Sequence, residues 1–198
     1  MKKLSNAIPP TPTLTPQDHT MASGREQCKT PKTLKMSLNK KKLSNFAYFC
    51  VTFLFFTCFN LYFSNLISYK LLNGLEFTSP LFNLVLTKNT GAAFSIMQNS
   101  TAFLIALSLI GFLAILYFVI KDLKTLRMKE ILFISFLMAG ILGNLYERAF
   151  LGYVRDFFEL AFVNFPIFNI SDIFINIGVI GIATLILLSR KSNKSNIK

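Results

Sequence analysis

Two aspartates stand in one largely apolar stretch near the end of the sequence. The stretch VRDFFELAFVNFPIFNISDIF, residues 154–174, carries Asp156 and Asp172. Asp172 is the fifth residue of an apolar run over residues 168–188, which is long enough to cross a bilayer. An ionised carboxylate costs on the order of 3 kcal/mol at the centre of a transmembrane helix, and less near the interface. A carboxyl group in this position is therefore a candidate functional group.

Acid-base catalysis is the chemistry open to such a pair. Asp156 lies in the segment that leads back to the start of this run, so both carboxyl groups can meet at one end of the protein. Carboxyl groups that share a site cannot both ionise readily, so one pKa rises and a proton is shared. The pair can then act as acid and base on a water molecule, as in an aspartic peptidase.

The residues alone leave a structural role equally open for both acids. In that interpretation Asp172 caps its helix, or it pairs with Arg148 or Arg155. Asp156 is then a solvated acid in a loop.

Few other catalytic chemistries are compatible with the composition. His19 is the single histidine, so a Ser-His-Asp triad or a His-Glu-x-x-His zinc site is close to excluded. The three cysteines form no Cys-x-x-Cys motif and no Cys/His cluster. We therefore expect no metal site.

The hydropathy pattern indicates an integral membrane protein. Hydrophobic residues make up 53% of the 198 positions, and the length fits one domain. Four apolar runs approach the ~20 residues that a bilayer requires. They cover residues 46–67, 101–120, 131–146 and 168–188. We expect the third to be interrupted near its end by Gly143 and Asn144.

The basic residues predict how these runs are oriented. Of the 21 Lys and Arg residues, nine lie in residues 1–45, four in residues 121–130 and four in residues 189–198. Such an alternation is typical of cytoplasmic segments in a membrane protein and argues against a nucleic-acid-binding face. Both termini are therefore predicted to be cytoplasmic.

The remaining segments are predicted to be tails and outer loops. Residues 1–45 are rich in Pro, Thr and Lys and are expected to form a disordered basic tail, with Met36 as a candidate translation start. Residues 189–198 form a second basic tail. The outer loops cover about residues 68–100 and 147–167, and the first contains β-branched and aromatic residues typical of short strands.

Three ordered motifs resemble those of a known family. The motifs are NTGAAFS from Asn89, GNLYERAFLGYVRDF from Gly143 and FNISDIFINIGV from Phe168. In this order they are similar to motifs of the bacterial lipoprotein signal peptidases, the signal peptidase II family of aspartic endopeptidases. The resemblance implies an all-α membrane protein over residues 46–188, with four transmembrane helices and a small extracytoplasmic β-cradle. It also implies the bacterial cytoplasmic (inner) membrane, with the active site near the extracytoplasmic face.

The resemblance also implies the site residues. The family's catalytic pair falls on Asp156 and Asp172. Its substrate-binding or site-supporting positions fall on Asn89, Gly91, Asn144, Glu147, Arg148 and Asn169. Glu147 stands where the family usually has Asp, and Asn60 stands nearest to an Asp of the family's first helix.

The substrate and partners follow from the same resemblance. A prolipoprotein whose lipobox cysteine carries diacylglycerol would be cleaved just before that cysteine. The partners would be these prolipoproteins and membrane lipids, without nucleic acid. The reaction would need no metal or organic cofactor, and the enzyme would be a monomer.

Three alternatives remain open. The first is a non-enzymatic four-span protein, such as a small transporter in which Asp172 relays protons. Against it, the polar residues gather at one end instead of lining a path across the membrane. The second is a Ser/Lys peptidase, with Ser95 or Ser171 as the nucleophile and Lys70 or Lys88 as the base. The third is a family member of altered activity.

Overall fold

Four helices and two strands make up the part of the chain that the computed structural model describes, residues 31–91 and 100–195. The helices are α1 (Pro31–Leu72), α2 (Thr101–Asp122), α3 (Met128–Leu151) and α4 (Ile170–Ser195). The strands are β1 (Phe82–Asn89), between α1 and α2, and β2 (Val154–Leu160), between α3 and α4.

All four helices contain a segment that is long and apolar enough to cross a membrane. These segments are Asn39–Leu72, Thr101–Asp122, Met128–Leu151 and Ile170–Arg190. The predicted fold class is confirmed: the protein is helical, with four candidate membrane spans and one small antiparallel sheet.

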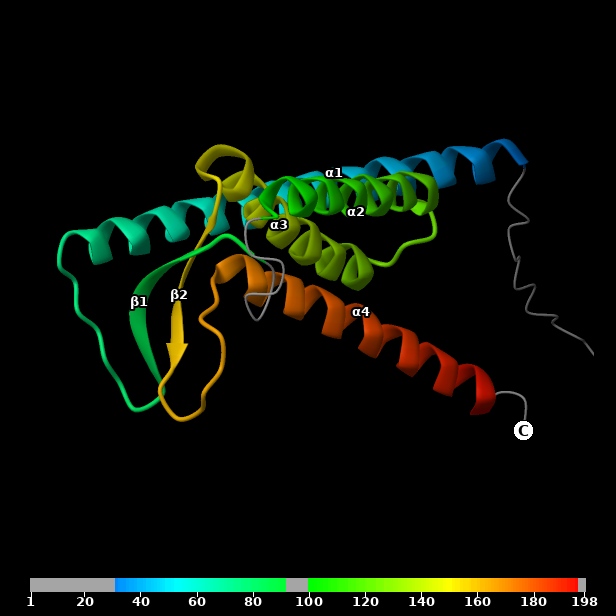
Figure 1. Cartoon of the computed structure of the whole chain (residues 1–198). Helices are drawn as coiled ribbons and strands as arrows, with labels where there is room; N and C mark the ends of the chain where they lie inside the picture. Colours follow the sequence, from blue (N-terminus) through cyan, green and yellow to red (C-terminus); the bar gives the residue numbers. More distant parts are fainter. Residues whose placement is uncertain (1–30, 92–99, 196–198) are drawn as a thin grey trace, which may run out of the picture.

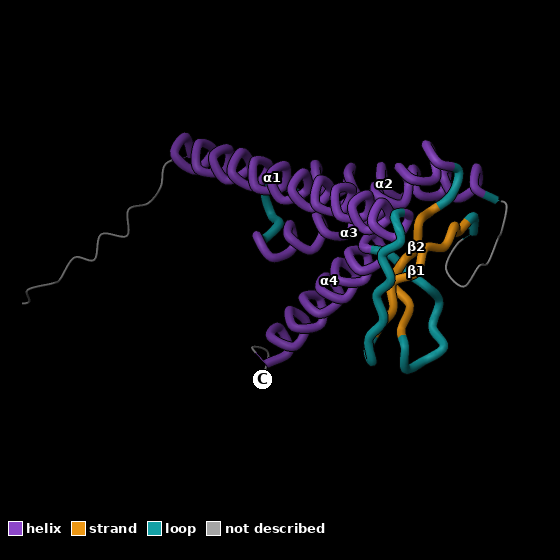
Figure 2. Tube along the Cα trace, turned by 90° about the vertical axis from the view of Figure 1, so that its left-hand side faces the viewer, coloured by secondary structure: helices purple, strands orange, loops and turns teal. Residues whose placement is uncertain are grey.

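The sheet lies at one end of the helices. In Figure 1 both strands lie beside the end of α1 and the start of α4, whereas the start of α1 and the end of α4 lie at the opposite end. The view turned by 90° in Figure 2 shows the same separation. α3 packs against each of the other three helices and is therefore the central element of the bundle.

α3 and α4 approach each other closely because α4 carries glycine at the contact. A Cβ atom added at Gly178 would lie 2.6 Å from the Cβ atom of Leu137 and 2.8 Å from the carbonyl oxygen of Phe133. Small residues at such positions let two helix backbones approach, which is how packing stabilises helices in a membrane.

α1 begins well before the predicted boundary. The helix starts at Pro31, so residues 31–45 are helical, in contrast to the expected disordered tail; residues 1–30 lie outside the described part. Part of the reason is Asn45, which is buried and whose Nδ2 donates to the carbonyl oxygens of Leu123 (2.7 Å) and Leu126 (3.0 Å). These bonds hold α1 at Asn45 against the connection between α2 and α3. At the other end of the chain α4 runs to Ser195, beyond the predicted end of the fourth run.

α3 is continuous through Gly143 and Asn144, where we predicted an interruption. The helix runs on to Leu151 and ends at Gly152, whose φ of 81° is the left-handed conformation that favours glycine. Gly143 does not break the helix but allows close approach, because an added Cβ there would collide with Asn60 of α1 and Ser171 of α4. Since the helix continues, Asn144 and Arg148 are four residues apart and share a face.

β1 and β2 pair antiparallel, and their register places one acid opposite β1. Asp156 pairs with Thr87, Arg155 with Lys88 and Val154 with Asn89, with an irregularity between Leu84 and Thr87. Side chains of a strand alternate between faces, so Asp156 and Arg155 point to opposite sides of the sheet.

A substitution of Gly178 by Ala tests the close contact between α3 and α4. The added methyl group must displace the α3 backbone, so we expect a loss of about 1–3 kcal/mol of stability. Thermal unfolding of the purified protein in detergent measures the loss. Gly111→Ala in α2 is the matched control, because nothing lies within 4 Å of its added Cβ. Equal melting temperatures for the two variants would contradict the packing described here.

Candidate active site

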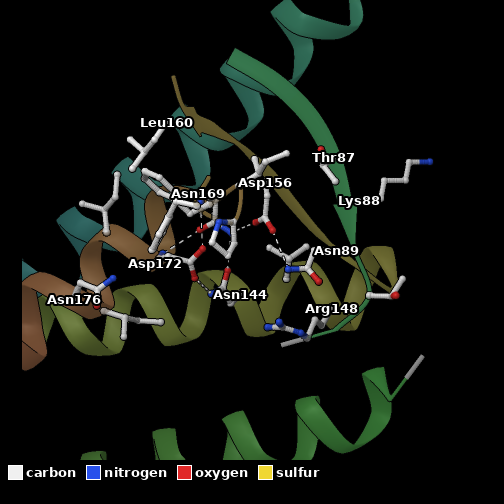
Figure 3. A pocket seen from close by; sticks show the side chains of 18 residues that line it. Thr87, Lys88, Asn89, Asn144, Arg148, Asp156, Leu160, Asn169, Asp172 and Asn176 are labelled. Carbon is white, nitrogen blue, oxygen red and sulfur yellow. Dashed lines mark hydrogen bonds between the residues drawn. The ribbon is translucent and has the colours of Figure 1, made fainter. Parts of the chain in front are cut away.

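A cavity of about 890 Å³ lies between the sheet, α3 and the first turns of α4 (Figure 3). Most of the polar residues predicted from the sequence line it: Asn89, Asn144, Arg148, Asp156, Asn169 and Asp172. The structure therefore brings together residues from four elements that are distant in the sequence. Within the described part of the chain, no group of three or more His, Cys, Asp or Glu side chains could hold a metal ion.

β2 positions Asp156. The residue is only 3% exposed. Asp156 pairs with Thr87, and Asn89 lies two residues further along β1, so the side chains of Asp156 and Asn89 are diagonal neighbours on the same face of the sheet. Asn89 Nδ2 donates to Asp156 Oδ2 over 2.9 Å, and Asn169 Nδ2 donates to Oδ1 over 2.7 Å. Both carboxyl oxygens are thus held by amide donors.

Asp172 is positioned by the N-terminus of α4. Asn169 Oδ1 accepts a hydrogen bond from the backbone N–H of Asp172 (3.0 Å), and Asp172 Oδ2 accepts one from the backbone N–H of Asn169 (3.2 Å). This reciprocal arrangement is a capping box. Asn144 Nδ2 donates to the other oxygen, Oδ1, over 2.9 Å. Asp172 therefore takes part in capping α4, as considered from the sequence, and it also lines the cavity.

Asn169 connects the two acids. Its Nδ2 donates both to Asp156 and, over 3.2 Å, to Asn144 Oδ1, while its Oδ1 and backbone N–H bond Asp172. Figure 3 shows the resulting network between the labelled side chains. The positions of both carboxyl groups are consequently coupled through one side chain.

Burial makes Asp156 a weaker acid than usual. Desolvation is the main reason that its pKa rises to about 6, and the hydrogen bond from Asn89 opposes the rise. The negative charges of Asp172 and Glu147 raise the pKa further, whereas the bond from Asn169 lowers it. Asp156 therefore changes protonation near neutral pH, where a general acid or base is most effective.

Arg148 closes the side of the cavity next to β1. Its Nη2 donates to the carbonyl oxygen of Gly91 over 2.9 Å, and the backbone N–H of Gly91 donates to Asn89 Oδ1. The Nε of Arg148 is buried and has no hydrogen-bond partner among the described residues.

Glu147 points away from the cavity and forms a buried ion pair. Its Oε1 accepts bonds from Arg155 Nη2 (2.6 Å) and Nε (3.0 Å), and its Oε2 accepts one from the Arg155 backbone N–H (2.7 Å). Arg155 Nη2 also donates to Asn65 Oδ1 of α1 over 2.8 Å. This ion pair joins α1, α3 and β2 directly beside Asp156.

The Ser/Lys alternative receives no support from the described residues. Ser171 is buried and faces α1, where its hydroxyl accepts a bond from Asn60 Nδ2 (2.8 Å). Lys70 is exposed on α1, and the Lys88 ammonium lies 5.0 Å from the centre of the Tyr153 ring. Ser95 lies outside the described residues. The bond from Asn60 also ties α1 to the residue preceding Asp172.

Comparison with known families gives a match over most of the chain. The family model of signal peptidase (SPase) II matches residues 52–188. The chain belongs to this family.

Relatives with curated names agree with the family match. A "Lipoprotein signal peptidase" of Enterococcus faecalis is 37% identical over 122 residues, which cover 60% of this chain and 73% of that protein. One of Dehalococcoides mccartyi is 40% identical over 114 residues, 56% of this chain and 70% of the other. Among solved structures, a bacterial membrane enzyme determined by the in meso method has a TM-score of 0.64 and 33% identity, over 74% of this chain and 90% of that one.

Arg155 and Asn176 are among the polar residues in or beside this cavity that were not singled out from the sequence as site residues of this signal peptidase II family member; Thr87 and Thr90 also line the cavity. Arg155 was considered only as a partner for Asp172, and its ion pair with Glu147 depends on the chain reversal at Gly152. Asn176 also lines the cavity, and its signal was available: it follows Asp172 by four residues and so shares a helix face with it.

Replacing Asp156 by Asn should make the stability of the protein less dependent on pH. Because the folded pKa of about 6 lies above the ordinary value of 3.8, the folded protein binds more protons between these values. The stability of the unchanged protein therefore falls as pH rises from about 4 to about 6, whereas the amide of the variant does not titrate. We expect the difference in unfolding free energy to grow by about 3 kcal/mol in favour of Asp156→Asn. Thermal unfolding in detergent across this range measures it, and a constant difference would contradict the raised pKa.

Breaking the ion pair should destabilise the site. In Arg155→Met the buried Glu147 carboxylate loses its partner, at a cost of about 3 kcal/mol. The double variant Arg155→Met/Glu147→Gln should recover part of this stability, because no unpaired charge remains. Melting temperatures in detergent measure both effects. Lys70→Met is the control, since this exposed lysine makes no ion pair with a described residue, and an equal loss there would argue against the role of the pair.

Proposed function

We propose that this chain is a lipoprotein signal peptidase in which Asp156 and Asp172 are the catalytic pair. The observation that carries the assignment is that both carboxyl groups are linked through Asn169 at one cavity. The reaction is hydrolysis of the peptide bond that joins the signal peptide to a prolipoprotein. Membership of the signal peptidase II family and the curated names of relatives support this activity.

The two carboxyl groups act as general base and general acid. An ionised carboxylate takes a proton from a water molecule, which attacks the scissile carbonyl carbon. The protonated partner donates a hydrogen bond to the carbonyl oxygen and stabilises the negative charge that develops there. The groups then exchange roles as the amine leaves with a proton. The amide donors of Asn89, Asn144 and Asn169 keep both carboxyl groups oriented throughout.

Arg148 and the main chain at Gly91 form the substrate-positioning wall of the cavity. The Gly91 carbonyl anchors the guanidinium, whose buried Nε has no hydrogen-bond partner among the described residues. We assign this donor to a main-chain carbonyl oxygen of the bound prolipoprotein, because a buried donor without a partner is costly. Glu147 supports the site from behind through Arg155.

The active site is assigned to the extracytoplasmic end of the bacterial inner membrane. The basic segments at residues 40–42, 121–130 and 189–198 mark the cytoplasmic side by the positive-inside rule. The start of α1 and the end of α4 lie opposite the sheet in Figure 1, so the sheet and the acids lie at the other face. Asp172 is the third residue of its span, at the depth where a lipidated cysteine would hold its peptide bond.

The proposed substrate carries diacylglycerol on the cysteine that follows the scissile bond. A site at the membrane interface receives such a cysteine directly from the bilayer, since the acyl chains stay in the lipid. Besides its polar groups the cavity has apolar walls that include Ile173, Ile175 and Phe168, which suit a lipid-embedded ligand. We propose that a monomer is sufficient, because all of the assigned groups come from one chain.

Cleavage of a diacylglyceryl-modified prolipoprotein in detergent or liposomes tests the proposal. We expect Asp156→Asn and Asp172→Asn each to lower turnover by roughly 10³-fold or more while membrane insertion is retained. Glu159→Gln is the matched control: Glu159 lies three residues after Asp156 on β2, bonds Asn83 and does not line the cavity. A gel shift of the substrate reports cleavage.

The outcomes of this assay separate the alternatives. Retained turnover in either Asp variant would reject the catalytic pair. Failure of the folded, unchanged protein to cleave the lipidated substrate would favour a family member of altered activity or a non-enzymatic protein.

A further inference from the structure

Asn176 is a polar residue of the cavity that the proposed chemistry leaves without a role. It lies on α4 four residues after Asp172, which is about 6 Å along the helix axis toward the cytoplasmic end. Its side chain is exposed and lines the cavity, and Figure 3 shows it beyond Asp172, away from Asp156. None of the hydrogen bonds among the described residues involves this side chain.

The depth of Asn176 makes an unoccupied amide costly. It is the seventh residue of the span Ile170–Arg190, about 9 Å from its start. Its neighbours on the cavity wall are Ile173 and Ile175, which offer no hydrogen-bond acceptor on their side chains. A polar group surrounded by hydrocarbon is disfavoured unless it finds a partner. Because Asn176 lines the cavity, a molecule bound there can supply this partner.

The geometry of a bound signal peptide supplies such a partner. With the scissile bond at Asp172, as proposed above, a signal peptide that crosses the membrane would run toward the cytoplasmic side, in the direction in which Asn176 lies. An extended chain advances about 3.3 Å per residue, so 6 Å corresponds to about two residues. The main-chain carbonyls of such an extended segment have no intrahelical partner and can accept a hydrogen bond from a side chain.

We propose that the Asn176 side chain donates a hydrogen bond to a main-chain carbonyl of the signal peptide, about two residues before the residue that provides the scissile carbonyl. Asn176 is then a substrate-binding residue that sets the position of the peptide along α4. The inference rests on the proposed peptidase function. The ester carbonyls of the diacylglyceryl group offer the same acceptor chemistry, but they are attached on the other side of the scissile bond.

The kinetics of Asn176→Leu on a synthetic diacylglyceryl lipopeptide test the inference. A hydrogen bond made equally in the bound and transition states affects KM and leaves kcat unchanged. We expect KM to rise roughly 3- to 10-fold, with kcat within about twofold of the unchanged protein. Asn176→Gln keeps an amide donor and should recover part of the affinity. Thr184→Leu is the matched control, because Thr184 is another exposed polar residue of α4 that does not line the cavity.

Altered lipopeptides identify the acceptor. Replacing the amide that carries the bonded carbonyl by an alkene removes the acceptor, so the unchanged protein should lose the same factor and Asn176→Leu should lose no more. A lipopeptide with ether-linked alkyl chains lacks the ester carbonyls, and the effect of Asn176→Leu should persist on it. An effect that vanishes on the ether-linked lipopeptide would assign the contact to the lipid and overturn the inference.

The remaining outcomes separate this inference from the proposed function. If the unchanged protein cleaves the reference lipopeptide but Asn176→Leu behaves like Thr184→Leu, the inference alone is wrong. A fall in kcat at constant KM would also overturn it, because Asn176 would then act on Asp172 and not on the peptide. No cleavage of the reference lipopeptide by the folded, unchanged protein would overturn the peptidase function and the inference with it.

Discussion

The hydrogen bonds of one side chain, that of Asn169, determine whether the two carboxyl groups share a site. Asn169 lies at the start of α4 and bonds Asp156 of β2, Asn144 of α3 and the backbone of Asp172. These four residues come from elements that approach one another only in the folded protein. The capping box and the bond from Asn144 fix the position of Asp172 at the start of α4, and the sheet must then be brought to it. The requirement for the rest of the fold is therefore to hold β2 against the first turn of α4.

Several features described above meet that requirement. The ion pair of Glu147 and Arg155 fixes β2 from the face opposite to Asp156, because neighbouring strand residues point to opposite sides. β1 holds Asp156 from the neighbouring strand, through the hydrogen bond that Asn89 donates to its carboxyl group. α3 carries groups for both purposes: Asn144 faces the acids and Glu147 faces the ion pair. The glycines at the contact between α3 and α4 let these two helices approach each other closely.

The sequence predicted the number of spans, the position of the sheet segment and the residues gathered at the cavity, because apolar length and local motifs depend on neighbouring residues. It failed where a contact from a distant segment decides the structure. Asn45 of α1 bonds the carbonyls of Leu123 and Leu126, and Gly143 packs closely against α1 and α4 within a continuous α3. The partner of Arg155 depends in the same way on how the chain reverses at Gly152. No local pattern contains these contacts.

The capping box at the start of α4 gives Asp172 two duties that cannot be changed separately. The carboxyl group that is assigned to catalysis also bonds the backbone of Asn169, and the Asn169 side chain bonds the backbone of Asp172 in return. A substitution that removes either side chain therefore also removes a cap of α4. An inhibitor that binds these atoms would leave the protein few routes to resistance, because a variant that removes either side chain would also weaken the start of its last membrane helix, by about 1 kcal/mol for a lost cap.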